Sequence, residues 1–364
     1  MSTRGRRAEA WTRAALTPPR AHGAPLSAAR IKAEPEDFRV EEELSFVPSG
    51  EGPHRLLRVE KRSANTRWVA AELARLAEVP VAEVGYAGLK DRHAVSVQWF
   101  SLPAARGTAE FWSTVHKDEF RVLESQLNTR KLRRGALRGN RFRIRLRQID
   151  WPRAALEEKL TALRTQGAPN YFGAQRFGRD GFNLDRVAEW LQSGKRPAAR
   201  AERGFTLSAA RSLIFNAVLG RRVQSADWSR LAPGDLASLD GSGSHFRVDA
   251  VDSELERRLD AFDIHPSGPM WGRGEPGTAG RALDTELEVA REFAPVAELL
   301  AQEGLEQERR ALRCAIRDLS VESEAATLIL SFTLGKGQFA TAVLREKCRS
   351  SQCCRKPQSV VSIR

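Results

Sequence analysis

One ten-residue stretch constrains the fold of this chain more than any other. In residues 138–147, RGNRFRIRLR, arginines alternate almost strictly with the apolar residues Phe142, Ile144 and Leu146. Because the side chains of a strand point alternately to its two faces, a period of two predicts a β-strand. One face would pack on a hydrophobic core, and the other would carry a row of guanidinium groups.

The basic charge of the chain is concentrated in the same region. The 364 residues carry a formal net charge of +13, which favours a polyanionic partner such as nucleic acid. No acidic residue lies between Arg130 and Arg147, so a general preference for arginine does not explain the patch. A charged edge strand that discourages aggregation is the alternative interpretation. We predict RNA-backbone contacts from Arg133, Arg134, Arg141, Arg143, Arg145 and Arg147.

The order of predicted elements favours an α+β fold. Strand-like segments occur within residues 31–60 and 84–102, on either side of a helix that Asn65 and Thr66 cap. Helical spacing dominates from residue 156 to 303, and β-like alternation returns after residue 320. This β–α–β order predicts a discontinuous core that contains an inserted second domain.

Several classes of protein and site are excluded by simple patterns. No apolar run approaches the ~20 residues that a membrane-spanning helix needs, so we expect no membrane partner. The four cysteines and six histidines show no metal-ligand spacing and no disulfide framework, so we expect no metal and a reducing, cytoplasmic setting. The absence of a carboxylate or histidine cluster argues against a metal-dependent nuclease.

The two ends of the chain differ from the rest in composition. Residues 1–25 are rich in arginine and are interrupted by Pro18, Pro19 and Gly23, which predicts a flexible N-terminal extension. Residues 347–364 form a basic tail that we expect to be disordered and without a specific role. An additional RNA-binding arm and a frameshifted or extended terminus are the alternatives for the tail.

The strongest candidate for chemistry is the segment GYAGLKDRHAV at residues 85–95. Two glycines allow a close backbone approach, and four consecutive ionisable residues follow between two strand-like segments. It is neither a phosphate-binding P-loop nor a dinucleotide fingerprint, because the required glycine spacing and helix are absent. On these residues alone, a polar hairpin turn is the simpler interpretation.

Seven sequence blocks, taken together with their order along the chain, change that interpretation. In chain order, the blocks are PEDFRVEEE, EKRSANT, GYAGLKDRHAVSVQWFSL, KLRRGALRGNRFRIRLR, PNYFGAQRFG, LSAARSLIFN and GQFATAVLRE. They strongly resemble segments of the tRNA pseudouridine synthase D family, which occur in the same order. The resemblance extends from about residue 26 to 346. It implies a pseudouridine-synthase core with a mixed, largely antiparallel sheet flanked by helices, and an inserted α/β domain. The implied catalytic domain covers residues 26–195 and 311–346, and the inserted domain covers 196–310.

The resemblance also implies a reaction and the residues that perform it. The family isomerises uridine to pseudouridine in tRNA, at uridine 13 of the D-arm, without a cofactor, and a monomer suffices for one tRNA. The family's catalytic aspartate falls on Asp91, a carboxylate able to act as nucleophile or base, although the atom it attacks stays open. The residues expected to bind the flipped uridine or shape its pocket are Phe38, Asn170, Phe339 and Phe172. Lys90 and Lys32 are further substrate-binding candidates, for pairing with Asp91 or with the target phosphate. A non-catalytic tRNA-binding or RNA-folding protein on the same scaffold is the alternative.

Overall fold

A computed structural model of the chain describes residues 3–26, 28–149, 151–324 and 326–346. Its internal contacts divide the chain into two compact units. Unit 1 comprises described residues within Met1–Ala24, Glu157–Ala315 and Gln338–Lys347. Unit 2 comprises those within Pro25–Leu156 and Ile316–Gly337. The predicted basic tail, residues 347–364, lies outside the described residues.

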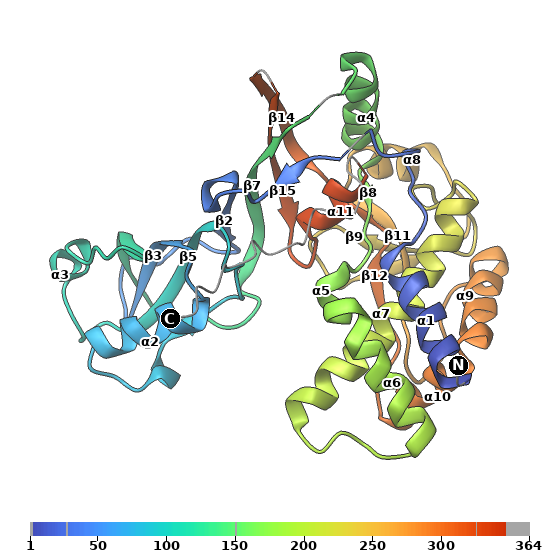
Figure 1. The fold of residues 1–364 in the computed structure, drawn as a ribbon, viewed down its shortest axis with the longest axis horizontal. Coiled ribbons are helices and arrows are strands. Elements are labelled where there is room, and N and C mark those ends of the chain that lie inside the picture. The colour runs from blue at the N-terminus through green and yellow to red at the C-terminus, as the bar shows by residue number, and fades with distance from the viewer. Residues whose placement is uncertain (1–2, 27, 150, 325, 347–364) are drawn as a thin grey trace, which may run out of the picture. The chain divides into compact units, whose positions relative to one another are not determined.

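Unit 2 is built on one mixed sheet (Figure 1). Its main path runs β14-β15-β7-β2-β5-β3-β6, while β1 pairs with β7 and β4 pairs with β5. Among the described strand pairs of this sheet, only β2 and β5 run parallel; the others are antiparallel. The strands are β1 (Arg30–Ile31), β2 (Phe38–Leu44), β3 (His54–Arg62), β4 (Gly85–Tyr86), β5 (Val95–Pro103), β6 (Phe120–Asn128), β7 (Leu137–Arg147), β14 (Arg317–Glu324) and β15 (Thr327–Gly335).

The strand predicted from alternation is β7, and its apolar residues Phe142, Ile144 and Leu146 are all buried. The predicted helix is α2 (Thr66–Leu76), and the Asn65 side chain caps it by accepting a hydrogen bond from the Arg67 amide at 2.8 Å. Apolar side chains of α2 pack with those of β3 and β5 in one hydrophobic cluster. Short helices complete the unit: α3 (Ala109–Ser113), η1 (Pro35–Asp37) and η2 (Val81–Glu83).

Unit 1 surrounds the long helix α7 (Arg200–Gln224), whose buried side chains form the centre of a second core. A small antiparallel sheet in the order β10-β9-β11-β12 and a short pair, β13-β8, belong to the same unit. Its other helices are α1 (Thr3–Leu16), most of α4 (Arg153–Gln166), α5 (Ala174–Phe177), η3 (Arg179–Gly181), α6 (Phe182–Ser193), α8 (Ser253–Asp260), α9 (Gly280–Glu292), α10 (Ala294–Gln302) and α11 (Ala340–Arg345). Its strands are β8 (Ala168–Pro169), β9 (Leu236–Leu239), β10 (His245–Arg247), β11 (Ile264–Met270), β12 (Glu308–Ala311) and β13 (Arg313–Cys314).

The predicted α+β class is confirmed by this combination of sheets and helices. The boundaries of the contact units differ from the predicted domains, because residues 157–195 group with unit 1 rather than with the sheet of unit 2. The assignment of residues 196–310 to an inserted domain stays a prediction. Among the described residues, no helix has both the length and the apolar character needed to cross a membrane.

Within residues 1–25, where the sequence predicts a flexible extension, the structure contains a helix, and the flexibility of the segment stays a prediction. Residues 3–16 form α1, in which Trp11 and Ala15 are buried in the core of unit 1 while Arg13 is exposed. The spacing of four between Trp11 and Ala15 puts them on one face of a helix, so a single interrupting arginine does not prevent packing. Pro18 and Pro19 follow α1, and their carbonyl oxygens accept hydrogen bonds from the Arg345 guanidinium.

Replacing Trp11 by alanine should therefore lower the free energy of unfolding by about 2 kcal/mol. This loss of unfolding free energy is smaller than the loss expected for a tryptophan at the centre of a core, because a terminal helix can detach locally. Urea-induced unfolding of the variant measures the effect, and Arg13→Ala on the exposed face of α1 is the matched control. Equal stability of both variants would mean that α1 contributes nothing to unit 1.

Candidate active site

Asp91 lies in the loop between β4 and β5, and its side chain is about one-third exposed. The Lys32 ammonium donates a hydrogen bond to Asp91 Oδ2 at 2.6 Å. The same ammonium lies 4.1 Å from the centroid of the Phe38 ring, which is a cation–π distance. Three predicted site residues, Lys32 and Phe38 near the N-terminus and Asp91 about 50 residues later, therefore meet in unit 2. Of the two lysines considered as partners of Asp91, the structure gives the pairing to Lys32.

The backbone of the Asp91 loop is fixed by two buried polar side chains. Gln98, on β5, donates a hydrogen bond from Nε2 to the carbonyl oxygen of Gly88 at 2.6 Å. The Thr66 hydroxyl donates to Gln98 Oε1 at 3.1 Å and accepts from the Lys90 amide at 3.0 Å. Because both side chains are buried, these bonds fasten the loop to the sheet and to the start of α2.

Lys61 holds the other side of the loop. Its ammonium donates to the carbonyl oxygen of Ala64 at 2.8 Å and to that of Asp91 at 3.0 Å. The residue is fully buried on β3. Burial lowers the pKa of Lys61 to about 8; the Asp91 charge opposes this shift, and the Lys90 charge adds to it. Asp91 is thus contacted by two lysines, Lys32 at its carboxylate and Lys61 at its main chain.

Lys90 does not pair with Asp91, although it precedes it in the sequence. Its ammonium lies 2.9 Å from Glu42 Oε2, and both side chains are buried. It also donates a hydrogen bond to Asn140 Oδ1. A buried ammonium with these partners is poorly placed to meet a phosphate in solvent, so the predicted substrate contact of Lys90 stays without structural support.

Asn140 was not among the predicted site residues. It lies on β7, two positions before Phe142, so it belongs to the face that otherwise carries apolar side chains. Its contact with Lys90 connects it to the Asp91 loop. The available signal was the polar residue that interrupts the apolar face of the alternating strand, within the block RGNRF. Lys61 carried a similar signal, because it shares a strand face with Leu57 and Val59.

Phe38 begins β2 and is positioned by its neighbours. Its ring packs edge-on against Phe142, with centroids 6.0 Å apart. The preceding residue, Asp37, is fully buried and accepts three hydrogen bonds of 2.8–3.0 Å from Arg147. These hydrogen bonds raise the pKa of the Arg147 guanidinium above its usual value. Arg147 therefore has a structural partner that anchors the start of β2.

The predicted acid-free row of arginines is neutralised in part by neighbouring strands. Arg141 pairs with Glu43 at 3.1 Å, and Arg143 pairs with Glu322 at 3.3 Å. The absence of acids within one sequence segment therefore does not make a surface free of acids. Arg145 is half-buried on the same strand.

Two other predicted arginines lie in the turn before β7. This turn contacts the Asp91 loop, because the Gly135 amide donates to the Ala87 carbonyl at 2.7 Å. Arg134 stacks on Tyr86, with its guanidinium carbon 4.3 Å from the ring centroid, and donates to the Tyr86 hydroxyl at 2.9 Å. Arg133 is exposed. Among the predicted RNA-backbone contacts, Arg133 and Arg134 thus belong to the turn that is hydrogen-bonded to the Asp91 loop.

Asn170 belongs to unit 1 and is buried. Its Oδ1 accepts hydrogen bonds from Arg310 at 2.6 Å and from the Cys314 thiol at 3.1 Å, while its Nδ2 donates to the Ala311 carbonyl at 2.9 Å. Both ends of the amide are therefore engaged by protein groups. Its predicted contact with the substrate gains no support from these partners.

Phe172 and Phe339 also belong to unit 1, and their rings lie 6.4 Å apart. Phe172 is buried, with the guanidinium carbons of Arg310 and Arg176 at 4.1 Å and 4.8 Å from its ring centroid. Burial lowers the pKa of Arg310 to about 10. Phe172 and Arg176 of the block PNYFGAQRFG thus form an aromatic and cationic cluster with Phe339 and Arg310, in which Phe172 is a packing residue.

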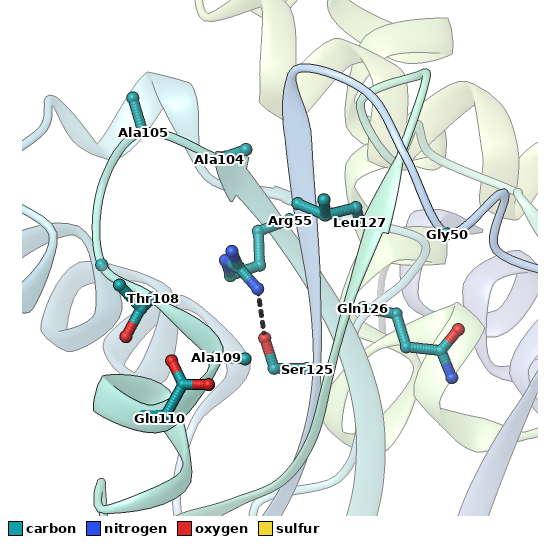
Figure 2. Close-up of a pocket in the computed structure, with 11 residues that line it drawn as sticks. Gly50, Arg55, Ala104, Ala105, Thr108, Ala109, Glu110, Ser125, Gln126 and Leu127 are labelled. Carbon is teal, nitrogen blue, oxygen red and sulfur yellow. Dashed lines mark hydrogen bonds between the residues drawn. The ribbon is translucent and has the colours of Figure 1, made fainter.

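A depression elsewhere in unit 2 has no relation to these residues (Figure 2). Arg55 and Ser125 meet there through a 3.0 Å hydrogen bond, beside Thr108 and Glu110. Its lining contains none of the predicted site residues. In the described part of the chain, no three His, Cys, Asp or Glu side chains gather as a metal ion would require.

Comparisons with known proteins agree with the ordered blocks of the sequence. The family model described as tRNA pseudouridine synthase D (TruD) matches residues 21–202 and 203–347. A curated tRNA pseudouridine synthase D from Nitrosococcus oceani is 46% identical over 336 residues, which cover 92% of this chain and 94% of that protein. One from Methylococcus capsulatus is 45% identical, covering 90% of this chain and 93% of the relative.

A solved structure shares the fold. It is the crystal structure of a protein assigned as tRNA pseudouridine synthase D from Methanosarcina mazei, with a TM-score of 0.65 and 20% sequence identity. The match covers 91% of this chain and 94% of that one. Together with the family match over nearly the whole sequence, these relatives show that the chain belongs to the tRNA pseudouridine synthase D family.

Proposed function

We propose that this chain isomerises uridine to pseudouridine in tRNA, at uridine 13 of the D-arm, with Asp91 as the catalytic carboxylate. The observation that carries the proposal is the contact of Asp91 with Lys32 and of Lys32 with Phe38. It joins a carboxylate, a cation and an aromatic ring at one site, within a chain of this family. The reaction needs no cofactor, and we propose that a cytoplasmic monomer performs it.

The chemistry explains why a fixed carboxylate is useful. The N1–C1′ glycosidic bond breaks, the uracil turns, and a bond forms between C5 and C1′ before C5 loses its proton. A carboxylate can assist as a nucleophile at C1′ or C6, or as a base at C2′, and can leave again. In each route the Asp91 oxygens must stay within reach of the nucleotide, which the Lys32 ion pair and the fastened loop favour.

Recognition of the uridine needs a stacking surface and a polar edge. We propose that Phe38 supplies the ring, since base–aromatic stacking contributes about 1–3 kcal/mol per base. For the polar edge we propose Asn140 in place of Asn170, because Asn140 is linked through Lys90 to the Asp91 loop. An amide offers both a donor and an acceptor to uracil. Asn170, Phe172 and Phe339 of unit 1 stay predictions from the family resemblance.

The test is incubation with unmodified tRNA, followed by carbodiimide mapping of pseudouridine at each position. We expect one new pseudouridine, mapped to position 13, and none in a tRNA that carries cytidine there. Salt-sensitive tRNA binding without any new pseudouridine would support the non-catalytic RNA-binding alternative instead. Modification at another position would contradict the assignment to uridine 13.

Arg133 is the best placed of the predicted backbone contacts, because it is exposed on the turn bonded to the Asp91 loop. Arg133→Ala should weaken tRNA binding about 3-fold regardless of sequence and reduce the slope of log K against log salt by about 1. Filter binding at several salt concentrations measures both quantities. Arg106→Ala, an exposed arginine elsewhere in unit 2, is the control; an unchanged slope for Arg133→Ala would remove Arg133 from the interface.

A further inference from the structure

Lys61 is a fully buried lysine whose ammonium is directed at main-chain carbonyls. It lies one residue before the end of β3, opposite Ser96 of β5 and Phe120 of β6. Its hydrogen bonds go to the carbonyl oxygens of Ala64 and Asp91. Burying a cation without a carboxylate hydrogen-bond partner is costly, and a methionine of similar length would avoid that cost. A purely structural role is therefore a poor explanation of a lysine at this position.

We propose that Lys61 is a positioning residue that fixes the main chain of Asp91 so that its carboxylate reaches the nucleotide. The inference rests on the proposed function of Asp91. Three side chains hydrogen-bond to the main chain of the loop: Gln98 at Gly88, Thr66 at Lys90, and Lys61 at Asp91 itself. Only the Lys61 attachment, among these three, acts on the catalytic residue. A charged donor also makes a stronger hydrogen bond to a carbonyl than a neutral one.

The surroundings make this attachment sensitive to pH. The charged groups near the ammonium are Asp91 and Lys90 of the loop, which are paired with Lys32 and with Glu42 of β2. Ser96 and Phe120, opposite it on the adjoining strands, and Asn65 and Thr66 at the start of α2 are uncharged. Arg92 and His93 are exposed on the same loop. With its pKa lowered to about 8, Lys61 loses its charge just above neutral pH, and the attachment weakens.

The decisive variant is Lys61→Met, measured by single-turnover modification of tRNA at saturating enzyme between pH 6 and 9.5. The rate constant at pH 7 should fall roughly 10- to 100-fold, because small displacements of a reacting group have effects of that size. The tRNA dissociation constant should change less than about 2-fold, and the melting temperature should stay equal or rise. The wild-type rate should decline above about pH 8, and this decline should be absent from Lys61→Met.

Lys117→Met is the matched control, since Lys117 pairs with Glu72 on the surface of unit 2 and should keep both rate and pH profile. Lys61→Gln, which keeps a neutral donor, should have an intermediate rate and gives a second variant if the methionine variant folds poorly. A Lys61→Met rate within 2-fold of wild type, or an alkaline decline that persists in it, would overturn the inference. Asp91→Asn is measured alongside: if it is inactive, such a result concerns Lys61 alone, whereas an active Asp91→Asn refutes the proposed function.

Discussion

Asp91→Asn is expected to lower the single-turnover rate of pseudouridine formation by on the order of 10³-fold or more. Asparagine has nearly the same shape, so the loop attachments through Gln98, Thr66 and Lys61 remain available to it. It lacks the negative charge that a nucleophile or base requires. Because the loss is confined to chemistry, tRNA affinity should change less than about 3-fold.

The experiment uses saturating enzyme and carbodiimide mapping of the product, with melting temperatures to verify folding. Asp118→Asn, which changes an exposed aspartate of the same unit, is the matched control and should be fully active. Retention of more than a tenth of the wild-type rate by Asp91→Asn would remove Asp91 from the catalytic role. A parallel loss in Asp118→Asn would show that the assay responds to charge rather than to catalysis.

The residues nearest to Asp91 show how much of the candidate site the sequence predicts. The resemblance to the family assigned roles to Asp91 and Phe38 from two blocks and Lys32 was a candidate partner of Asp91; the structure brings these three together. The alternation of arginines with apolar residues predicted β7, and the capping residue Asn65 predicted the start of α2. Both predictions succeeded because these signals depend on local geometry alone. Local patterns of this kind are preserved whatever the rest of the chain does.

The sequence does not predict which side chains pair across strands, because the register of the strands decides these pairs. Glu43 and Glu322 face Arg141 and Arg143 only after β2 and β14 take their places in the sheet. For the same reason the sequence did not predict Asn140 as a site residue, because its contact with Lys90 joins segments that are distant in sequence. It predicted Asn170 instead, which lies in the conspicuous block PNYFGAQRFG. Helix α1 was missed because its apolar face is narrow and its partners lie far along the chain.

Glu42→Gln is the change expected to have the largest effect on stability. It leaves the buried Lys90 ammonium without its carboxylate, and removal of one member of a buried pair costs about 3–5 kcal/mol. Glutamine keeps the volume of the side chain, so little of the loss arises from packing. Urea-induced unfolding measures it. Glu36→Gln in the exposed pair with Arg62 is the control and should cost less than about 1 kcal/mol.

Lys90→Met should be destabilising to a similar extent, because it leaves Glu42 buried without a cation. The double variant, Glu42→Gln with Lys90→Met, carries no buried charge at this pair and should cost only about 1–2 kcal/mol. The single costs would then exceed the double cost severalfold, which identifies direct coupling between the two side chains. Additive single costs would mean that each residue acts through other neighbours. Since Lys90 adjoins Asp91, the same pair links the stability of the sheet to the geometry of the Asp91 loop.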